Sequence, residues 1–356
     1  MANVLVLGAT GQVGIALALE SLSAGHSVTG IGQTSFHSKP DTMQNKFRAV
    51  NITYEHMDIF EPRNQADLRK LFAKHDIVFH AAEPYPYEQA DVTKAIRGNT
   101  GVIRTAIDAG YTIDKGNRKV FVRVGSPPVE TNHDGFSLSE NPYPGIPYFD
   151  AKWAMSRNAW RAFSSEGAAI MTVVFPAVFG FGANHGKLEA LARYINGEFP
   201  LILSILTNAA PAAHVARGAL LAAEHGSPGK TYQLAGIDVD TSKIIRHAMK
   251  CAGVKGMRSL IPTIRIPLTF MRSAAYAMGA VSRLNGTMPP ELDPSSFAIL
   301  ANMGSRSYYL AEESIGYRAP TMTALFEAIE QQVAWYRDTG MIKSKGHKRS
   351  NAKEII

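Results

Sequence analysis

The chain has 356 residues, of which 46% are hydrophobic and 19% charged, a composition typical of a globular protein and not of a disordered one. Its formal charge of +7 lies partly in a basic tail, residues 341–356, that we interpret as a solvated segment, and nothing in the chain resembles a nucleic-acid-binding module. The single cysteine, Cys251, excludes an internal disulfide framework, and no leader pattern is visible, so we expect a cytoplasmic protein.

The first predicted element is a buried parallel strand, Val4–Leu7, followed by glycines at positions 8, 11 and 14 and by an apolar helical pattern. In such a strand–turn–helix unit, Gly8 allows the sharp turn and Gly11 leaves room for a pyrophosphate. Gly14 lets the helix pack closely on the strand. The spacing predicts dinucleotide binding, and a tight turn without a ligand is the alternative.

The second predicted strand, residues 27–32, ends at the position that selects the cofactor. An acidic residue there would accept hydrogen bonds from the ribose 2′-hydroxyl and favour NAD(H). Here Gln33 follows the strand, and no carboxylate occurs before Asp41. Lys39 could face a 2′-phosphate, or it could be a solvated loop charge. We therefore expect NADP(H) or NAD(H), with NADP(H) favoured.

A third strand is expected within residues 47–57. Asp58 follows it, where a carboxylate could contact the adenine edge or cap the next helical stretch. The fourth predicted strand, residues 77–79, precedes His80, Ala81 and Ala82. The two alanines allow backbone to lie against a cofactor, whereas His80 is interpreted as a packed structural histidine.

A helix is expected over residues 92–109 and a fifth strand over residues 120–124. Strands and helices thus alternate along the first part of the chain. This order predicts an α/β fold, a parallel sheet with helices on both faces.

A catalytic constellation follows the fifth strand. Ser126 comes at its carboxyl end, where ligands of such sheets bind. Tyr148 and Lys152 are four residues apart and share one face of a predicted helix. A neighbouring ammonium favours the phenolate form of a tyrosine, so Tyr148 could exchange a proton with an alcohol oxygen while Ser126 holds that oxygen. A surface pair on a helix is the alternative interpretation of Tyr148 and Lys152.

With these motifs the sequence resembles the extended, or atypical, short-chain dehydrogenases/reductases of the NAD-dependent epimerase/dehydratase superfamily, near dihydroflavonol reductases and 3β-hydroxysteroid dehydrogenases. The resemblance spans about residues 3 to 340. It includes residues 8–14, 80–82, 126, 148, 152, 175–180, 229–234, 314–320 and 334–336.

The resemblance implies a doubly wound parallel Rossmann sheet and a catalytic triad of Ser126, Tyr148 and Lys152, with Lys152 also holding the nicotinamide ribose. The sequence shows no metal-ligand spacing, so no metal site is expected. The cofactor contacts that it implies are Gly8, Thr10, Gly11, Gln12, Val13, Gly14, Gln33, Asp58, Ile59, Ala81, Ala82, Tyr148, Lys152, Pro176 and Val178.

Three departures from the family pattern stand out. Phe175 replaces a usual arginine. If Asn99-Thr100 matches the family's Gly-Thr, Ile96 stands where an asparagine supports the tyrosine, and Asn99 is displaced by almost a turn. Two prolines, at 127 and 128, occupy the place of the acidic pair of dehydratases, which argues against elimination chemistry.

The expected domains are a Rossmann domain of residues 1–181, to which 208–236 return, and a discontinuous, mainly helical substrate lobe of residues 182–207 and 237–340. The lobe is expected to contain helices at residues 187–195 and 241–252, the second with a threonine cap. The mostly apolar segment 261–284 predicts a lid over the substrate, with core packing or interfacial membrane contact as alternatives. It is too short and too charged for a transmembrane helix.

These observations predict an NAD(P)-dependent oxidoreductase that interconverts a secondary alcohol and a ketone or aldehyde on a small, apolar substrate. The alternatives are a sugar-nucleotide epimerase with retained NAD and a non-catalytic NAD(P)-binding regulatory protein. The expected partner is a small-molecule substrate, not nucleic acid, and a homodimer is an open alternative.

Overall fold

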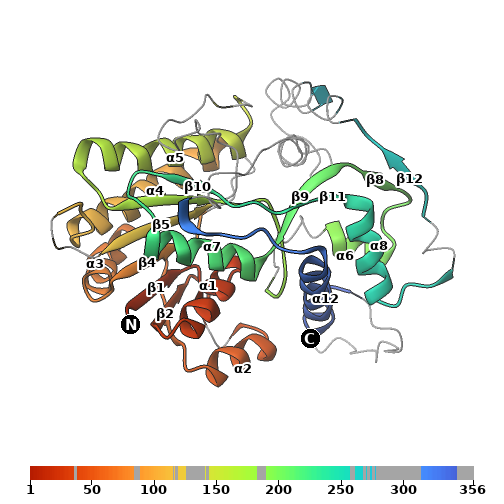
Figure 1. Ribbon diagram of the computed structural model, residues 1–356, viewed down its shortest axis with the longest axis horizontal. Coiled ribbons are helices and arrows are strands. Elements are labelled where there is room, and N and C mark those ends of the chain that lie inside the picture. Colours follow the sequence, from red (N-terminus) through yellow and green to blue (C-terminus); the bar gives the residue numbers. More distant parts are fainter. Residues whose placement is uncertain are drawn as a thin grey trace, which may run out of the picture.

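The computed structural model describes residues 1–35, 38–83, 89–114, 116, 119–125, 141, 144–182, 190–256, 261–267, 270, 273–274, 277 and 314–342. Two groups of elements lie side by side, one built on a large sheet and the other on smaller sheets (Figure 1). None of the helices in these ranges is both long and apolar enough to cross a membrane.

The large sheet has seven strands, all parallel to their neighbours. Their spatial order is β10 (Thr231–Gln233), β6 (Ile170–Val174), β5 (Val120–Gly125), β4 (Ile77–His80), β1 (Asn3–Leu7), β2 (Ser27–Gly32) and β3 (Thr53–His56). The order reverses at β1, with β2 on one side and β4 on the other, so the carboxyl end of β1 is the switch point where such sheets bind ligands. The predicted doubly wound α/β fold is confirmed.

Helices cover both faces of this sheet (Figure 1). One face carries α1 (Gln12–Ser23), α2 (Asp41–Ala49) and α7 (Ala212–His225), and the other carries α3 (Gln65–Ala73), α4 (Gln89–Asp108) and α5 (Pro147–Glu166). Strand β1 needs a helical layer on each face of the sheet. Val4 and Val6 pack into the apolar core on the face with α1, whereas Leu5 and Leu7 pack into the core on the face with α3. Each such side chain contributes about 1.5–3 kcal/mol when fully buried.

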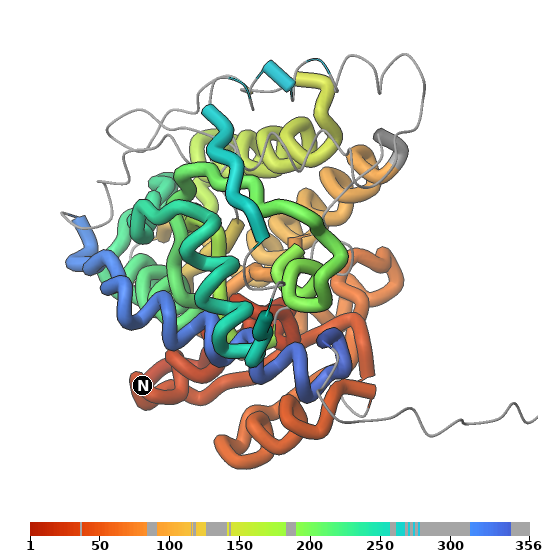
Figure 2. The backbone as a smooth tube through the Cα atoms, turned by 90° about the vertical axis from the view of Figure 1, so that its right-hand side faces the viewer, coloured from red at the N-terminus to blue at the C-terminus, as the bar shows by residue number. Residues whose placement is uncertain are grey.

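The second group contains two small sheets. Strands β7 (Ala177–Phe179), β9 (Leu206–Pro211) and β11 (Ile237–Asp240) form one, and β8 (Ile202–Ser204) pairs in parallel with β12 (Thr263–Arg265). The helices here are α6 (Ala190–Asn196), α8 (Thr241–Cys251) and α12 (Met322–Asp338), and Figure 2 shows α12 beside α8. Of the expected lid segment 261–284, residues 268–269, 271–272, 275–276 and 278–284 lie outside the described residues.

The predicted threonine cap of α8 is wrong. Asp240 is the N-cap residue, and its side chain makes no capping hydrogen bond. The Thr241 hydroxyl instead donates to the carbonyl of Leu203 at 3.0 Å and accepts from the Ile205 amide at 3.1 Å. This threonine therefore attaches α8 to the chain between β8 and β9.

Candidate active site

The loop between β1 and α1 is shaped by three glycines. Gly8 has φ of +83°, and a Cβ there would lie 2.9 Å from the Ala81 oxygen and the Ala82 nitrogen, beyond β4. A Cβ on Gly14 would lie 2.0 Å from the Gly8 oxygen, so helix α1 approaches the turn too closely for any side chain. An added Cβ on Gly11 would meet only the Gly8 oxygen, at 3.3 Å, among the described residues. These contacts leave an open side at the start of α1, which fits a pyrophosphate.

Gln12, the first residue of α1, has a buried side chain that joins three elements. Its amide nitrogen donates to the Gly180 carbonyl at 3.1 Å and to the side-chain oxygen of Gln332, on α12, at 3.3 Å. The Gly180 amide donates to the same Gln332 oxygen at 3.0 Å. Because the Gln12 side chain is engaged with α12, any contact from Gln12 to an anion would come from its backbone N–H, which has no acceptor within the helix.

The other predicted contacts near the turn differ in burial. Thr10 and Val13 are half-buried, and Val178 is half-buried on β7. Pro176 is buried just before that strand. Ile59 is 4% exposed and packs in the core with Leu5 and Leu7, so its side chain supports the sheet.

Gln33 and Asp58 lie beyond the ends of the adjacent strands β2 and β3. The Gln33 amide donates to one Asp58 carboxylate oxygen at 2.7 Å, and the other oxygen accepts from the Phe60 amide at 3.0 Å. The next helical turn and α3 have Glu61 and Asn64 as N-cap residues. Asp58 therefore caps neither helix, and its carboxylate stands at the sheet edge together with the Gln33 amide.

Tyr148 and Lys152 occupy adjacent turns at the start of α5. Their exposed fractions are 2% and 3%, and the Lys152 nitrogen lies 5.7 Å from the centroid of the Tyr148 ring. The alternative interpretation as a surface pair is therefore wrong, since both residues are buried. Ser126 directly follows Gly125, the last residue of β5, and lies outside the described residues.

Two further charged side chains surround Lys152, and the sequence interpretation missed both. Glu83, just beyond β4, accepts a hydrogen bond from the Lys152 ammonium at 2.7 Å and forms an ion pair with Arg123 of β5. The side chains of Glu83, Arg123 and Lys152 are 3%, 1% and 4% exposed. Arg123 was detectable, because a charge in the apolar run Val120–Val124 must be buried with a partner.

Burial and charge oppose each other in this cluster. Burial raises the pKa of the Glu83 carboxyl, but the positive charges of Arg123 and Lys152 act more strongly together and lower that pKa to about 2. Burial lowers the pKa of Lys152, and the Glu83 carboxylate opposes that shift. The three charges sum to one positive charge beside Tyr148.

His80 lies in the same region and is fully buried, as expected of a structural histidine. Its Nε2 is 3.0 Å from the side-chain nitrogen of Asn99, and its ring packs between Phe60 and Phe121. Burial, more than its charged neighbours, lowers the pKa of His80 to about 4, so the ring is neutral near pH 7. Asn99 therefore supports His80 on β4.

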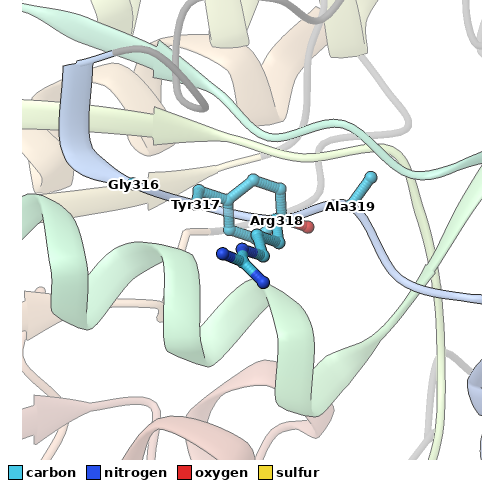
Figure 3. A pocket seen from close by; sticks show the side chains of 4 residues that line it. All are labelled: Gly316, Tyr317, Arg318 and Ala319. Carbon is cyan, nitrogen blue, oxygen red and sulfur yellow. The ribbon is translucent and has the colours of Figure 1, made fainter.

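A separate hollow of about 570 Å³ is lined by Gly316, Tyr317, Arg318 and Ala319 (Figure 3). Tyr317 lies close to α7, because a Cβ on Gly218 would be 3.0 Å from its ring, and its hydroxyl donates to the Ala235 carbonyl at 2.8 Å. None of the described residues expected to contact the cofactor lines this hollow.

Among the described residues, one group of metal-ligand type stands apart from the sheet. His247 and Cys251 of α8 and Glu330 of α12 have ligand atoms within 4.8 Å of one another. The His247 Nε2 is 3.2 Å from a Glu330 oxygen, and burial raises the pKa of the Cys251 thiol. We interpret this group as a contact between α8 and α12.

The family model described as the NAD dependent epimerase/dehydratase family matches residues 4–235. This match covers more than half of the chain and includes the glycine turn, Tyr148 and Lys152. The chain therefore belongs to the NAD-dependent epimerase/dehydratase family, and the predicted family is confirmed. No curated protein matches the sequence.

Several solved structures share the fold. A nucleoside-diphosphate-sugar epimerase from Pseudomonas aeruginosa is 20% identical with a TM-score of 0.69, and the match covers 96% of this chain and 99% of that one. WbmH from Bordetella bronchiseptica, in complex with NAD⁺, is 17% identical with a TM-score of 0.66, over 96% of this chain and 100% of that one. UDP-glucuronic acid 4-epimerase from Bacillus cereus, with UDP-glucuronic acid and NAD, is 16% identical with a TM-score of 0.62, over 95% and 99%.

Proposed function

We propose that this protein is an NAD(P)-dependent dehydrogenase or reductase that interconverts a secondary alcohol and a ketone or aldehyde on a small, apolar substrate. The observation that carries the proposal is the buried Tyr148 with the Lys152 ammonium 5.7 Å from its ring centroid. A non-catalytic cofactor-binding protein needs the glycine turn but has no use for this pair.

In the proposed reaction, Tyr148 donates a proton to the carbonyl oxygen during reduction and accepts one from the alcohol during oxidation. A nicotinamide cofactor held at the glycine turn would supply or accept the hydride. The positive charge at Lys152 favours the phenolate form of Tyr148 and so lowers the barrier to proton transfer. Ser126 donates a hydrogen bond to the same substrate oxygen. The Gly8–Gly14 turn holds the cofactor diphosphate through backbone N–H groups at the start of α1.

Two observations on the described residues of the substrate side support an apolar substrate. Phe175 replaces the family's arginine and packs against the core. Arg193 forms an ion pair with Glu198 at 2.9 Å and stacks on Phe199 with 4.5 Å to the ring centroid. A nucleotide sugar would need cations or backbone donors for its diphosphate, whereas an apolar ligand needs only a few polar groups for orientation.

For the cofactor we propose a preference for NADP(H). The residue after β2 is the neutral Gln33, whose amide is directed at Asp58. A carboxylate at position 33 would accept from the ribose 2′-hydroxyl of NAD(H), and its absence leaves room for a 2′-phosphate. Lys39 follows Gln33 closely in the sequence and is half-buried. We expect its ammonium to contact the 2′-phosphate.

The test is a screen of aryl and steroid ketones and their alcohols, with UDP- and GDP-sugars in parallel, using NADPH and NADH and following nicotinamide absorbance. Tyr148→Phe should lower turnover by roughly 10²- to 10⁴-fold while cofactor binding is retained, because the ring stays and the proton donor is lost. Tyr111→Phe is the matched control, since that buried hydroxyl donates to the backbone carbonyls of Phe72 and His75. Conversion of a nucleotide sugar with no net change in NAD(P)H would overturn the proposal in favour of an epimerase.

A further inference from the structure

Glu83, Arg123 and Lys152 form an ionic cluster at the carboxyl ends of β4 and β5. The carboxylate lies between the two cations, bonded to the Lys152 ammonium at 2.7 Å and paired with the Arg123 guanidinium. Each side chain is at least 96% buried. Removing charges from water is costly, so packing alone does not account for such a cluster.

A chain of hydrogen bonds closes the cluster into a ring. The Arg123 guanidinium donates to the Ser156 hydroxyl at 2.7 Å, and that hydroxyl donates to the backbone carbonyl of Lys152 at 2.9 Å. Ser156 lies one turn after Lys152 on α5. The ring therefore fixes both the backbone and the ammonium of Lys152 relative to β4 and β5.

Gly125 shows that the fold makes room for this carboxylate. A Cβ at position 125 would lie 2.8 Å from one Glu83 oxygen and 3.3 Å from an Arg123 nitrogen. Because Gly125 does not have a positive φ, its backbone does not require glycine. The Glu83 carboxylate occupies the space that a Cβ would take at the end of β5, so an alanine at position 125 would displace that carboxylate.

We infer that Glu83 is a positioning residue, which holds the Lys152 ammonium beside Tyr148 and keeps it in its charged form. This inference rests on the proposed function, in which the charge of Lys152 assists Tyr148. Without the carboxylate, Lys152 would be buried beside Arg123 with no counter-charge and would readily lose its proton. Arg123 in turn keeps Glu83 ionised and directed toward Lys152.

The charged and titratable groups that face Lys152 come from three elements. They are His80 on β4 with Glu83 just beyond it, Arg123 on β5, and Tyr148 on α5. His80, with its pKa near 4, is neutral above pH 6, and guanidinium groups keep their charge in proteins. A pH effect between pH 6 and 9 that depends on Glu83 therefore reports on Lys152 or Tyr148.

The test compares Glu83→Gln, Glu83→Asp and wild type in kcat, KM and cofactor Kd across pH 6–9. Glu83→Gln should lower kcat by on the order of tenfold at pH 7, with the loss growing tenfold per pH unit above the new pKa of Lys152. Glu83→Asp keeps the charge and should retain the pH profile of wild type with a smaller loss of kcat. Glu166→Gln, which removes an exposed carboxylate that pairs with Arg104, is the matched control and should leave kcat and its pH profile unchanged.

The outcomes separate this inference from the proposed function. If Lys152→Met abolishes activity while Glu83→Gln keeps the wild-type kcat and pH profile, the inference fails and the function stands. If no compound in the screen is turned over, the proposed function fails. The inference is then tested by measuring the Kd for NADPH as a function of pH. Glu83→Gln should weaken NADPH binding by a factor that grows as pH rises. An unchanged Kd profile in Glu83→Gln would overturn it. If Glu83→Gln does not fold, Gly125→Ala is the second variant, because its methyl group displaces the Glu83 carboxylate. Gly125→Ala should reduce kcat or weaken NADPH binding. Wild-type values of both kcat and NADPH Kd would overturn the inference.

Discussion

The buried His80 makes the stability of the fold depend on pH. Its pKa falls from about 6.5 when unfolded to about 4 when folded, chiefly because burial penalises the charged ring. The unfolded chain therefore binds a proton at a higher pH than the folded chain does. The resulting stability is fully present above pH 6.5 and is lost as pH falls through 4. At about 1.36 kcal/mol per pKa unit, the contribution is about 3 kcal/mol.

His80→Gln removes this titration and keeps a side chain that can hydrogen-bond to Asn99. We expect urea unfolding at pH 7, 6, 5 and 4 to show that the unfolding free energy falls with decreasing pH. Between pH 7 and pH 4 the loss should be about 3 kcal/mol larger for wild type than for the variant. His225→Gln, at an exposed position on α7, is the control and should follow wild type. Equal slopes for His80→Gln and wild type would refute the assignment of the low pKa to His80.

Two further predictions concern the cofactor end of the sheet. Gln33→Asp should weaken NADPH binding relative to NADH binding, because it places a second carboxylate beside Asp58. A fluorescence titration measures both affinities, and a preference of the wild-type protein for NADH would contradict the NADP(H) proposal. Gly14→Ala should lower stability by roughly 1–3 kcal/mol and weaken cofactor binding, since its Cβ would lie 2.0 Å from the Gly8 oxygen. Gly101 lies within helix α4, and an added Cβ there would meet only the Gln65 side-chain nitrogen of α3, at 4.0 Å, among the described atoms outside its own helix backbone. Gly101→Ala should therefore stabilise the fold by about 0.5–1 kcal/mol, as measured by thermal unfolding.

Much of the first sheet could be predicted from the sequence because its elements carry strong local patterns. The strand Val4–Leu7 is continuously apolar since helices cover both faces, and the glycine spacing reflects contacts that exclude a Cβ. The pair of Tyr148 and Lys152 follows from helical periodicity alone. Their predicted roles, like those of the cofactor contacts, stay predictions.

The tertiary contacts could not be predicted in the same way. The side chain of Gln12 meets Gln332 across a sequence separation of 320 residues, and no local pattern encodes that pairing. Thr241 had the residue type of a helix cap, but it bonds to the chain between β8 and β9. Long-range partners of this kind override local preference, as tertiary context commonly does.

Arg123 leads to a final prediction, because strand register explains how its partner is supplied. Arg123 is opposite His80 in the parallel pairing of β4 and β5, so Glu83, three residues further on, is well placed to fold back to it. Glu83→Gln leaves the buried Arg123 guanidinium without a counter-charge and favours loss of the Lys152 proton, so it should cost roughly 3–5 kcal/mol of unfolding free energy. Adding Arg123→Met removes the unpaired guanidinium, so the double variant should be more stable than Glu83→Gln alone, by about 0.5–3 kcal/mol. Urea unfolding at pH 7 of wild type, both single variants and the double variant measures this coupling. If Arg123→Met costs as much stability in the Glu83→Gln variant as it does in wild type, the two side chains are energetically independent. Glu83, Arg123 and Lys152 would then not form one coupled cluster.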